Sequence, residues 1–282
     1  DSRTRTVTIT DETRPDSPAA HVLEFSRLGQ LVRRATGARE TRWTHDADGL
    51  RTSVQSPDGS TTRYEHDAAG RVVRVEHSVF GEARYEHDAA GRLLQARAGD
   101  QLQTWEYVNG HVVRHARIDA EGTQVSTVAR DADGRITRVD GAGKSVSYEH
   151  DDAAQLVAAV HEGGRTDWVY DAAGRLVEER TDSGARRFSY DAAGQLSRVD
   201  APDGLPEVEY AYDGAGRRVQ ALRADGVTTT YGWTPQGHLT GVAESTAAGS
   251  TTTDLQVDAL GELADVDGVP IDWDTAAFAP TL

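Results

Sequence analysis

Residues Trp168–Leu196 read WVYDAAGRLVEERTDSGARRFSYDAAGQL. This stretch contains the phrase Tyr-Asp-Ala-Ala-Gly twice, at Tyr170–Gly174 and at Tyr190–Gly194. A second turn signal, Asp-Ser-Gly at 182–184, lies between the two copies. Internal periods of about 20–50 residues indicate a repeat architecture. The spacing of the phrase therefore decides how the rest of the chain is interpreted.

The phrase recurs along nearly the whole chain, at intervals of about 21 residues. Two strong copies are Tyr64–Arg71 and Tyr85–Arg92, which both read YEHDAAGR. The glycines that end the copies are Gly29, Gly49, Gly70, Gly91, Gly110, Gly134, Gly174, Gly194, Gly216, Gly237 and Gly261, and Ala154 takes this place between Gly134 and Gly174. The chain is thus an array of about twelve repeats.

The Asp-x-x-Gly part of each repeat predicts a tight turn. Aspartate suits the first position of a type I turn, where its carboxylate accepts a hydrogen bond from the N–H two residues on. Glycine at the fourth position adopts φ > 0 and closes the hairpin. The predicted turn residues are Asp67, Gly70, Asp88, Gly91, Asp131, Gly134, Asp171, Gly174, Asp191, Gly194, Asp213 and Gly216. The aromatic residues predicted to flank these turns are Tyr64, Tyr85, Tyr148, Tyr170, Tyr190 and Tyr212.

The segments between the turns are short and rich in β-branched and aromatic residues, which is typical of strands. Each repeat is therefore predicted to be a strand, a turn, a strand and a second turn. The predicted fold class is all-β, a repeat array of about twelve antiparallel β-hairpins. Twisted sheets of more than about ten strands curl, split or close. We therefore expect a curled, cocoon-like sheet of about 24 strands.

The repeat pattern divides the chain into three segments. An N-terminal strand and loop occupy residues 1–20, the repeat array occupies 21–263, and an irregular C-terminal tail occupies 264–282. One elongated array is expected rather than two domains, because the period is unbroken. The longest spacings between repeats predict extended loops at 120–127 and 244–253.

The phrase Tyr-Asp-x-x-Gly-Arg-Leu resembles the YD repeats of Rhs proteins, teneurins and insecticidal Tc toxin C components, over residues 25–263. This resemblance implies a hollow β-cocoon, which in bacterial members encloses a C-terminal toxin. Bacterial members commonly end the shell in a self-cleaving aspartyl-protease-like region with an Asp-Pro-x-Gly-Leu motif, which this sequence lacks. The sequence also contains no methionine. We therefore expect the chain to be a segment of a shell.

Composition excludes several classes of partner. The formal net charge of −16 disfavours nucleic acid, whose phosphates require a basic surface. Zero cysteines exclude disulfides and thiolate metal sites. No run of about 18 apolar residues is present, so no membrane-spanning helix is expected.

Candidate chemical motifs are better explained by the repeat. Gly141–Ser145 ends like a phosphate-binding loop. Such a loop requires a glycine at position 138, where this sequence has an arginine, and a strand is expected to follow instead of a helix. The His-Asp pairs at 66–67, 87–88 and 150–151 occupy the Tyr-Asp position of other repeats. Adjacent strand residues point to opposite faces, which prevents simple chelation. We predict no catalytic, cofactor-binding or metal-ligating residue, and no enzymatic activity.

The expected function is that of a structural shell segment of a secreted or delivered Rhs-type polymorphic toxin, which encapsulates a toxin cargo. Its partners would be the rest of its own shell and the enclosed cargo, with self-association through open sheet edges. Its expected location is extracellular or inside a target cell after delivery. A carbohydrate-binding or cell-wall-binding hairpin module, and an extracellular adhesion spacer, remain alternatives.

Overall fold

The computed structural model describes residues 4–10, 20–202, 205–258 and 261–271, and these contain strands and turns but no helix. The chain divides into two compact parts, which we call the N-terminal half (residues 1–128) and the C-terminal half (residues 129–274). The strands of the N-terminal half are β1 Arg5–Ile9, β2 His21–Phe25, β3 Leu31–Thr36, β4 Arg39–His45, β5 Arg51–Gln55, β6 Thr61–His66, β7 Val72–His77, β8 Gly81–His87, β9 Leu93–Ala98, β10 Gln101–Val108, β11 His111–Asp119 and β12 Gly122–Arg130, the last of which ends in the C-terminal half. The C-terminal half continues with β13 Ile136–Gly141, β14 Lys144–His150, β15 Leu156–His161, β16 Gly164–Tyr170, β17 Leu176–Thr181, β18 Gly184–Tyr190, β19 Leu196–Asp200, β20 Val208–Tyr212, β21 Arg218–Arg223, β22 Thr228–Trp233, β23 Leu239–Thr246, β24 Gly249–Val257, β25 Leu263–Val266 and β26 Val269–Pro270.

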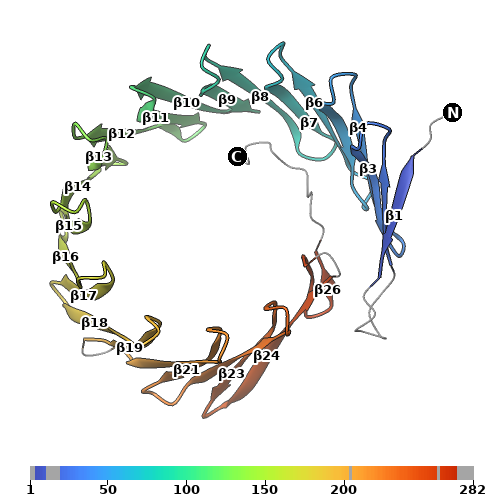
Figure 1. Cartoon of the computed structure of the whole chain (residues 1–282). Coiled ribbons are helices and arrows are strands. Elements are labelled where there is room, and N and C mark those ends of the chain that lie inside the picture. The colour runs from blue at the N-terminus through green and yellow to red at the C-terminus, as the bar shows by residue number, and fades with distance from the viewer. Residues whose placement is uncertain (1–3, 11–19, 203–204, 259–260, 272–282) are drawn as a thin grey trace. The chain divides into compact units, whose positions relative to one another are not determined.

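Within each half, every strand pairs antiparallel with the next strand in the chain. In the N-terminal half this ladder runs from β1 to β12. In the C-terminal half it runs from β13 to β26. Figure 1 shows that the sheet of each half curls along its row of strands. The predicted all-β array of antiparallel hairpins is confirmed.

Two details of the predicted organisation differ in the structure. The stretches expected to be extended loops belong to long hairpins instead, which are formed by β11 with β12 and by β23 with β24. Strand pairing also continues past the boundary placed at 263, because a tight turn with Asp267 at φ 52° and Gly268 at φ 80° joins β25 to β26. The division into two halves falls within β12, in one of the longest spacings between repeats. The loop expected at 11–20 and the tail beyond Ile271 lie outside the described residues, apart from residue 20.

A β-bulge follows the turn in almost every repeat and explains why the apolar alternation in the sequence is loose. In β7, for example, Val72 lies opposite His66 and Arg74 lies opposite Glu65, so that Val73 is an extra residue. The same register shift occurs beside the equivalent turns of other hairpins in both halves. A bulge places two residues opposite one and increases the local twist. A strict period-2 pattern is therefore broken once in each of these repeats.

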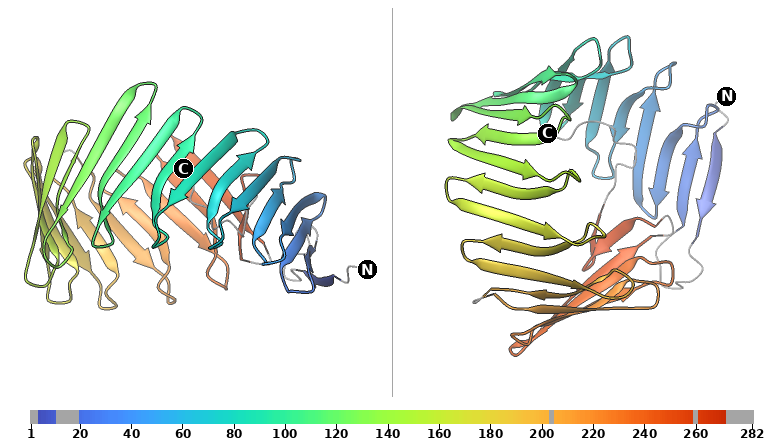
Figure 2. Two further views of the ribbon diagram at one scale, coloured as in Figure 1. Left: turned by 90° about the horizontal axis from the view of Figure 1, so that it is seen from above. Right: turned by 60° about the vertical axis from the view of Figure 1, so that its left-hand side comes forward.

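Each half is a single layer of strands (Figure 2). Buried apolar residues are few and mostly small, and include Ala96, Ala116 and Ala158. Trp43 and Val54, which lie opposite each other on β4 and β5, are the most buried large pair, at 3% exposure each. No large side chain among the described residues is completely buried. Stability must therefore come from contacts between neighbouring hairpins, since a one-layer sheet has no deep core.

Candidate functional site

The feature that repeats with the sequence is the Asp-x-x-Gly turn, and the turn at Asp67–Arg71 shows its construction. The N–H of Asp67 donates to the carbonyl of Arg71, and the N–H of Gly70 donates to the carbonyl of Asp67. Both N···O distances are 2.9 Å. The Oδ1 atom of Asp67 accepts hydrogen bonds from the N–H groups of Ala69, at 2.9 Å, and Arg71, at 3.0 Å. Gly70 has φ 77°, a conformation that glycine adopts without steric cost.

All the other predicted turn pairs have the same geometry. The carboxylates of Asp88, Asp131, Asp171, Asp191 and Asp213 each accept the same two backbone hydrogen bonds. Their glycines, Gly91, Gly134, Gly174, Gly194 and Gly216, have φ values between 77° and 85°. Ala154 takes the glycine position of one further turn at φ 62°, a strained conformation for a residue with a Cβ atom.

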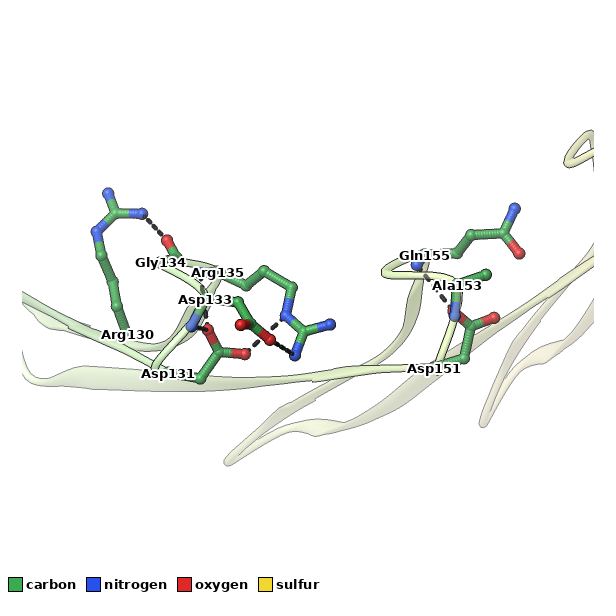
Figure 3. Close-up of polar contacts among 8 residues, drawn as sticks. All are labelled: Arg130, Asp131, Asp133, Gly134, Arg135, Asp151, Ala153 and Gln155. Carbon is green, nitrogen blue, oxygen red and sulfur yellow. Dashed lines mark hydrogen bonds and ion pairs between the residues drawn. The ribbon is translucent and has the colours of Figure 1, made fainter.

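The arginine that follows the glycine clamps the turn from the side, which the turn pattern alone did not predict. In Figure 3, Nε of Arg135 donates to Oδ2 of Asp131 at 2.7 Å, whereas the neighbouring turn at Asp151 has Gln155 at that position and lacks the clamp. The same pairing joins Arg71 to Asp67, Arg92 to Asp88, Arg175 to Asp171, and Arg217 to Asp213. The signal that could have revealed it is the repeated Gly-Arg dipeptide.

The clamp shifts the titration of the turn aspartates. The hydrogen bond from the Arg71 side chain, together with the backbone N–H of the same residue, lowers the pKa of Asp67 to about 2. Hydrogen bonds from arginine side chains and backbone N–H groups likewise lower the pKa of Asp131 and Asp213. These carboxylates therefore stay ionised as structural acceptors, because a carboxylate bonded by several donors resists protonation.

The residue after the glycine also reaches the next repeat. Nη1 of Arg71 donates to the carbonyl of Asp88 at 2.6 Å, and Nη1 of Arg217 donates to the carbonyl of Thr234 at 2.7 Å. The guanidinium of Arg175 lies 4.7 Å from the ring centroid of Tyr190, a cation–π distance. Successive turns are thus connected by side chains as well as by the backbone ladder.

The structure separates the six predicted aromatic residues into two positions. Tyr170, Tyr190 and Tyr212 lie four residues before the turn glycine, and each hydroxyl donates to a backbone carbonyl of the preceding repeat at 2.8 Å. The acceptors are the carbonyls of Leu156, Leu176 and Leu196. Trp233 uses the same position, since its Nε1 donates to the carbonyl of Arg218 at 2.8 Å, and Tyr107 bonds the Leu93 carbonyl in the N-terminal half. We call this contact the repeat lock.

Tyr64, Tyr85 and Tyr148 lie instead six residues before the glycine or its replacement and pack across the hairpin. Their opposite residues are Val75, Ala96 and Ala159. Tyr85 is the most buried tyrosine, at 6% exposure, and burial raises the pKa of its hydroxyl. In these three repeats a histidine takes the lock position, and within the described part of the chain its shorter side chain makes no equivalent bond.

Charged pairs line the exposed side of the strands. Arg74 of β7 bonds Glu65 of β6 at 2.5 Å and Glu82 of β8 at 2.6 Å, so that one guanidinium spans three strands. Arg198 makes a similar group with Asp200, Glu207 and Glu209. Exposed ion pairs contribute little individually, about 0–1 kcal/mol. Their role here is to pair the charged side chains that a one-layer sheet, partly polar on its surface, exposes to solvent.

The described residues hold no group of three or more histidine or acidic side chains arranged to bind a metal ion. They also contain no helix long and apolar enough to cross a membrane. The Gly141–Ser145 segment is a tight β13–β14 hairpin, with Ala142 at φ 52° and Gly143 at φ 73°. The recurring turn, clamp and lock define a class of protein, the single-layer hairpin repeat.

Comparison with known proteins identifies the repeat. The RHS repeat family matches residues 45–83, 130–166, 170–206 and 190–228. These segments are RHS repeats of the YD type, as the turn sequence predicts. No match to the chain was found among curated proteins.

Solved structures of Tc toxins share the fold. The TcdB2–TccC3–Cdc42 complex aligns with a TM-score of 0.65 and 17% identity, over 88% of this chain and 15% of its own. TcdB2–TccC3–TEV aligns at 0.66 and 17%, over 93% and 17%. A mutant Tc holotoxin pore of Photorhabdus luminescens aligns at 0.67 and 16%, over 93% and 16%. The chain therefore spans about a sixth of the length of these proteins.

Proposed function

We propose that this chain is a wall segment of an RHS-type shell and that its role is structural. The observation that carries the proposal is the repeat lock, in which Tyr170, Tyr190, Tyr212 and Trp233 each bond a carbonyl of the preceding repeat. A one-layer sheet without a deep core is a poor frame for a catalytic site, but a ladder of locked hairpins makes a continuous barrier.

The proposal extends to the partners of the wall. We infer that the chain joins further shell of the same protein and encloses a toxin polypeptide, in a protein that is secreted or delivered to a target cell. The fold that it shares with Tc toxin components supports this inference. Among the described strands β1 pairs with β2 alone, so its outer edge offers unpaired N–H and C=O groups to a continuing strand or to a second copy.

The alternative of a carbohydrate-binding module has less support from the aromatic residues. Sugar-binding hairpins need free aromatic faces, whereas here the tyrosines at the lock position are half-buried and bonded to backbone carbonyls. The ring of Trp105 stacks on that of His115, with 5.1 Å between centroids, and Trp43 is buried. The aromatic rings at these positions are thus engaged in contacts within the sheet.

The experiment compares the shell with the binding module in two measurements. Limited proteolysis of the protein that the gene encodes should leave the repeats and an enclosed polypeptide intact, and a variant that weakens the wall, such as Gly174→Val, should expose that polypeptide to cleavage. Light scattering of the isolated chain should show self-association. Calorimetric titration with peptidoglycan fragments, calcium and zinc should show no binding. A monomeric chain that binds a saccharide stoichiometrically at micromolar affinity would replace the shell with the binding module.

A further inference from the structure

The lock position differs between repeats along the chain. Four consecutive repeats of the C-terminal half have Tyr170, Tyr190, Tyr212 and Trp233 there, whereas three consecutive hairpins of the N-terminal half have a histidine: His45, His66 and His87. The Nδ1 atoms of His45 and His87 are buried and have no hydrogen-bond partner. An imidazole is shorter than a phenol, so a polar atom is left inside the sheet where tyrosine would complete a bond.

Of these three histidines, His45 is the one that lies opposite an arginine on the next strand. It ends β4, and the residue opposite it on β5 is Arg51, which replaces the leucine or valine found there in most repeats. The guanidinium of Arg51 lies 5.6 Å from the ring centroid of Tyr64 on β6. Asp46 is the neighbour in sequence, and the preceding turn presents the uncharged Gln30 near Gly49. Among the described residues, the charges that act on the imidazole are therefore those of Arg51 and Asp46.

We propose that protonation of His45 opens the β4–β5 hairpin, so that the N-terminal half of the sheet loosens in mild acid while the tyrosine-locked hairpins stay closed. An imidazolium at this position would be a second positive charge opposite Arg51, in a partly dry slot that offers its Nδ1–H no acceptor. Two residues earlier lies the most buried large pair, Trp43 with Val54. Opening this hairpin would hydrate the tightest packing in the described sheet.

The direction of the pH effect follows from linkage. Burial, and then the charge of Arg51, lower the pKa of His45 in spite of the opposing charge of Asp46. The open hairpin therefore takes up the proton first, at the ordinary histidine pKa of about 6.5. The closed β4–β5 hairpin therefore has its full stability above about pH 6.5 and loses stability as the pH falls from there to the lower pKa of the closed state. Over this range the equilibrium constant for opening the hairpin rises by up to about tenfold per pH unit. The turn aspartates act only in stronger acid, because their ordinary pKa is about 3.9.

A shared metal ion does not explain the histidines. Consecutive lock positions lie two strands apart, which places them about 9.6 Å from each other. A metal ion that binds two imidazoles must lie within about 2.1 Å of a nitrogen atom of each ring. The acid response of the β4–β5 hairpin therefore needs no second histidine, and it does not depend on the proposed shell function.

The test is hydrogen exchange measured by mass spectrometry on the whole chain at pH 7.5, 6.5 and 5.5, with protection factors corrected for intrinsic rates. Protection of residues 39–55 should fall by up to about tenfold between pH 6.5 and 5.5, while residues 164–181, which contain Tyr170 at the lock position, keep theirs. His45→Tyr should abolish the loss in residues 39–55, and His150→Tyr in the C-terminal half is the matched control that should leave it unchanged.

A second variant separates the charge from the burial. Arg51→Leu restores the residue typical of the position and removes the like charge, so the loss of protection should persist but become smaller. A titration of His45 by NMR in the unaltered chain should give a pKa below that of the exposed histidines. Unchanged protection of residues 39–55 from pH 7.5 to 5.5, or an equal loss in His45→Tyr, overturns the proposal.

Discussion

The turn at Asp213–Arg217 allows a comparison of two glycines only two residues apart. Gly216 has φ 80°, and a Cβ atom there would lie 2.9 Å from Nε2 of Gln195. Gly214 has no such backbone constraint, and a Cβ atom added there would meet nothing within 4 Å. Most other repeats have alanine where Gly214 lies. We therefore expect Gly216→Ala to destabilise the protein and Gly214→Ala to be neutral or stabilising.

The magnitude follows from three contributions. An alanine in the left-handed region costs about 1–2 kcal/mol. Displacing Gln195 weakens its hydrogen bond to the Gly216 carbonyl, 3.1 Å long, which is worth about 0.5–1.5 kcal/mol. Reduced freedom of the unfolded chain returns about 0.4–1 kcal/mol in both variants. Gly216→Ala should therefore cost about 0.5–3 kcal/mol, and Gly214→Ala should gain up to about 1 kcal/mol.

Urea unfolding followed by circular dichroism measures both variants, and hydrogen exchange of residues 208–223 locates the effect. Ala154→Gly is the reciprocal test, because it relieves a φ of 62° at the same turn position and should stabilise the chain. Equal losses for Gly216→Ala and Gly214→Ala would refute the left-handed turn as the source of the glycine period. So would a destabilised Ala154→Gly.

Three further predictions concern the lock and the clamp. Tyr190→Phe removes the hydroxyl that bonds the Leu176 carbonyl and should cost about 1 kcal/mol in urea unfolding, whereas Tyr190→Trp should retain part of it. His87→Tyr should gain about 0.5–1.5 kcal/mol, because the new hydroxyl fills a position with an unpartnered nitrogen; no gain would contradict the lock. Asp67→Asn should reduce the loss of stability in strong acid, because the lowered pKa of Asp67 gives stability that is present above about pH 3.9 and is lost as the pH falls to about 2. If the variant loses as much stability as the unaltered chain between these pH values, the Arg71 clamp is ruled out.

The turns could be predicted from the sequence because each is determined within five residues. The carboxylate of Asp67 and the backbone of Gly70 need no distant partner, so the pattern alone reports them. The lock could not be predicted, because the bond from Tyr190 to Leu176 depends on a strand register that includes a bulge. A single extra residue per hairpin changes which side chains meet, and no residue type marks it.

Residues that break the pattern could not be interpreted without the structure. Arg51 and Arg218 replace an apolar residue, and each lies against tyrosine rings, with Arg218 at 4.2 Å from the Tyr210 centroid.

From the turn pattern, Gly164→Val is expected to cost less than Gly174→Val, since Gly164 lies outside the main turn. The structure removes the basis of that expectation without ranking the two costs, because Gly164 also has a positive φ, 141°, and a Cβ atom there would lie 2.3 Å from an Asp182 oxygen.

The lock also determines how such a protein can change in length over evolution. Every donor from Tyr170 to Trp233 reaches a carbonyl 14 to 16 residues earlier in the chain, and the lock reaches no further than the preceding repeat. Duplicating or deleting one complete repeat therefore restores every bond at the junction, whereas an insertion of half a repeat leaves a donor facing the wrong strand. Gene segments of about 21 codons are the natural unit of growth for this sheet.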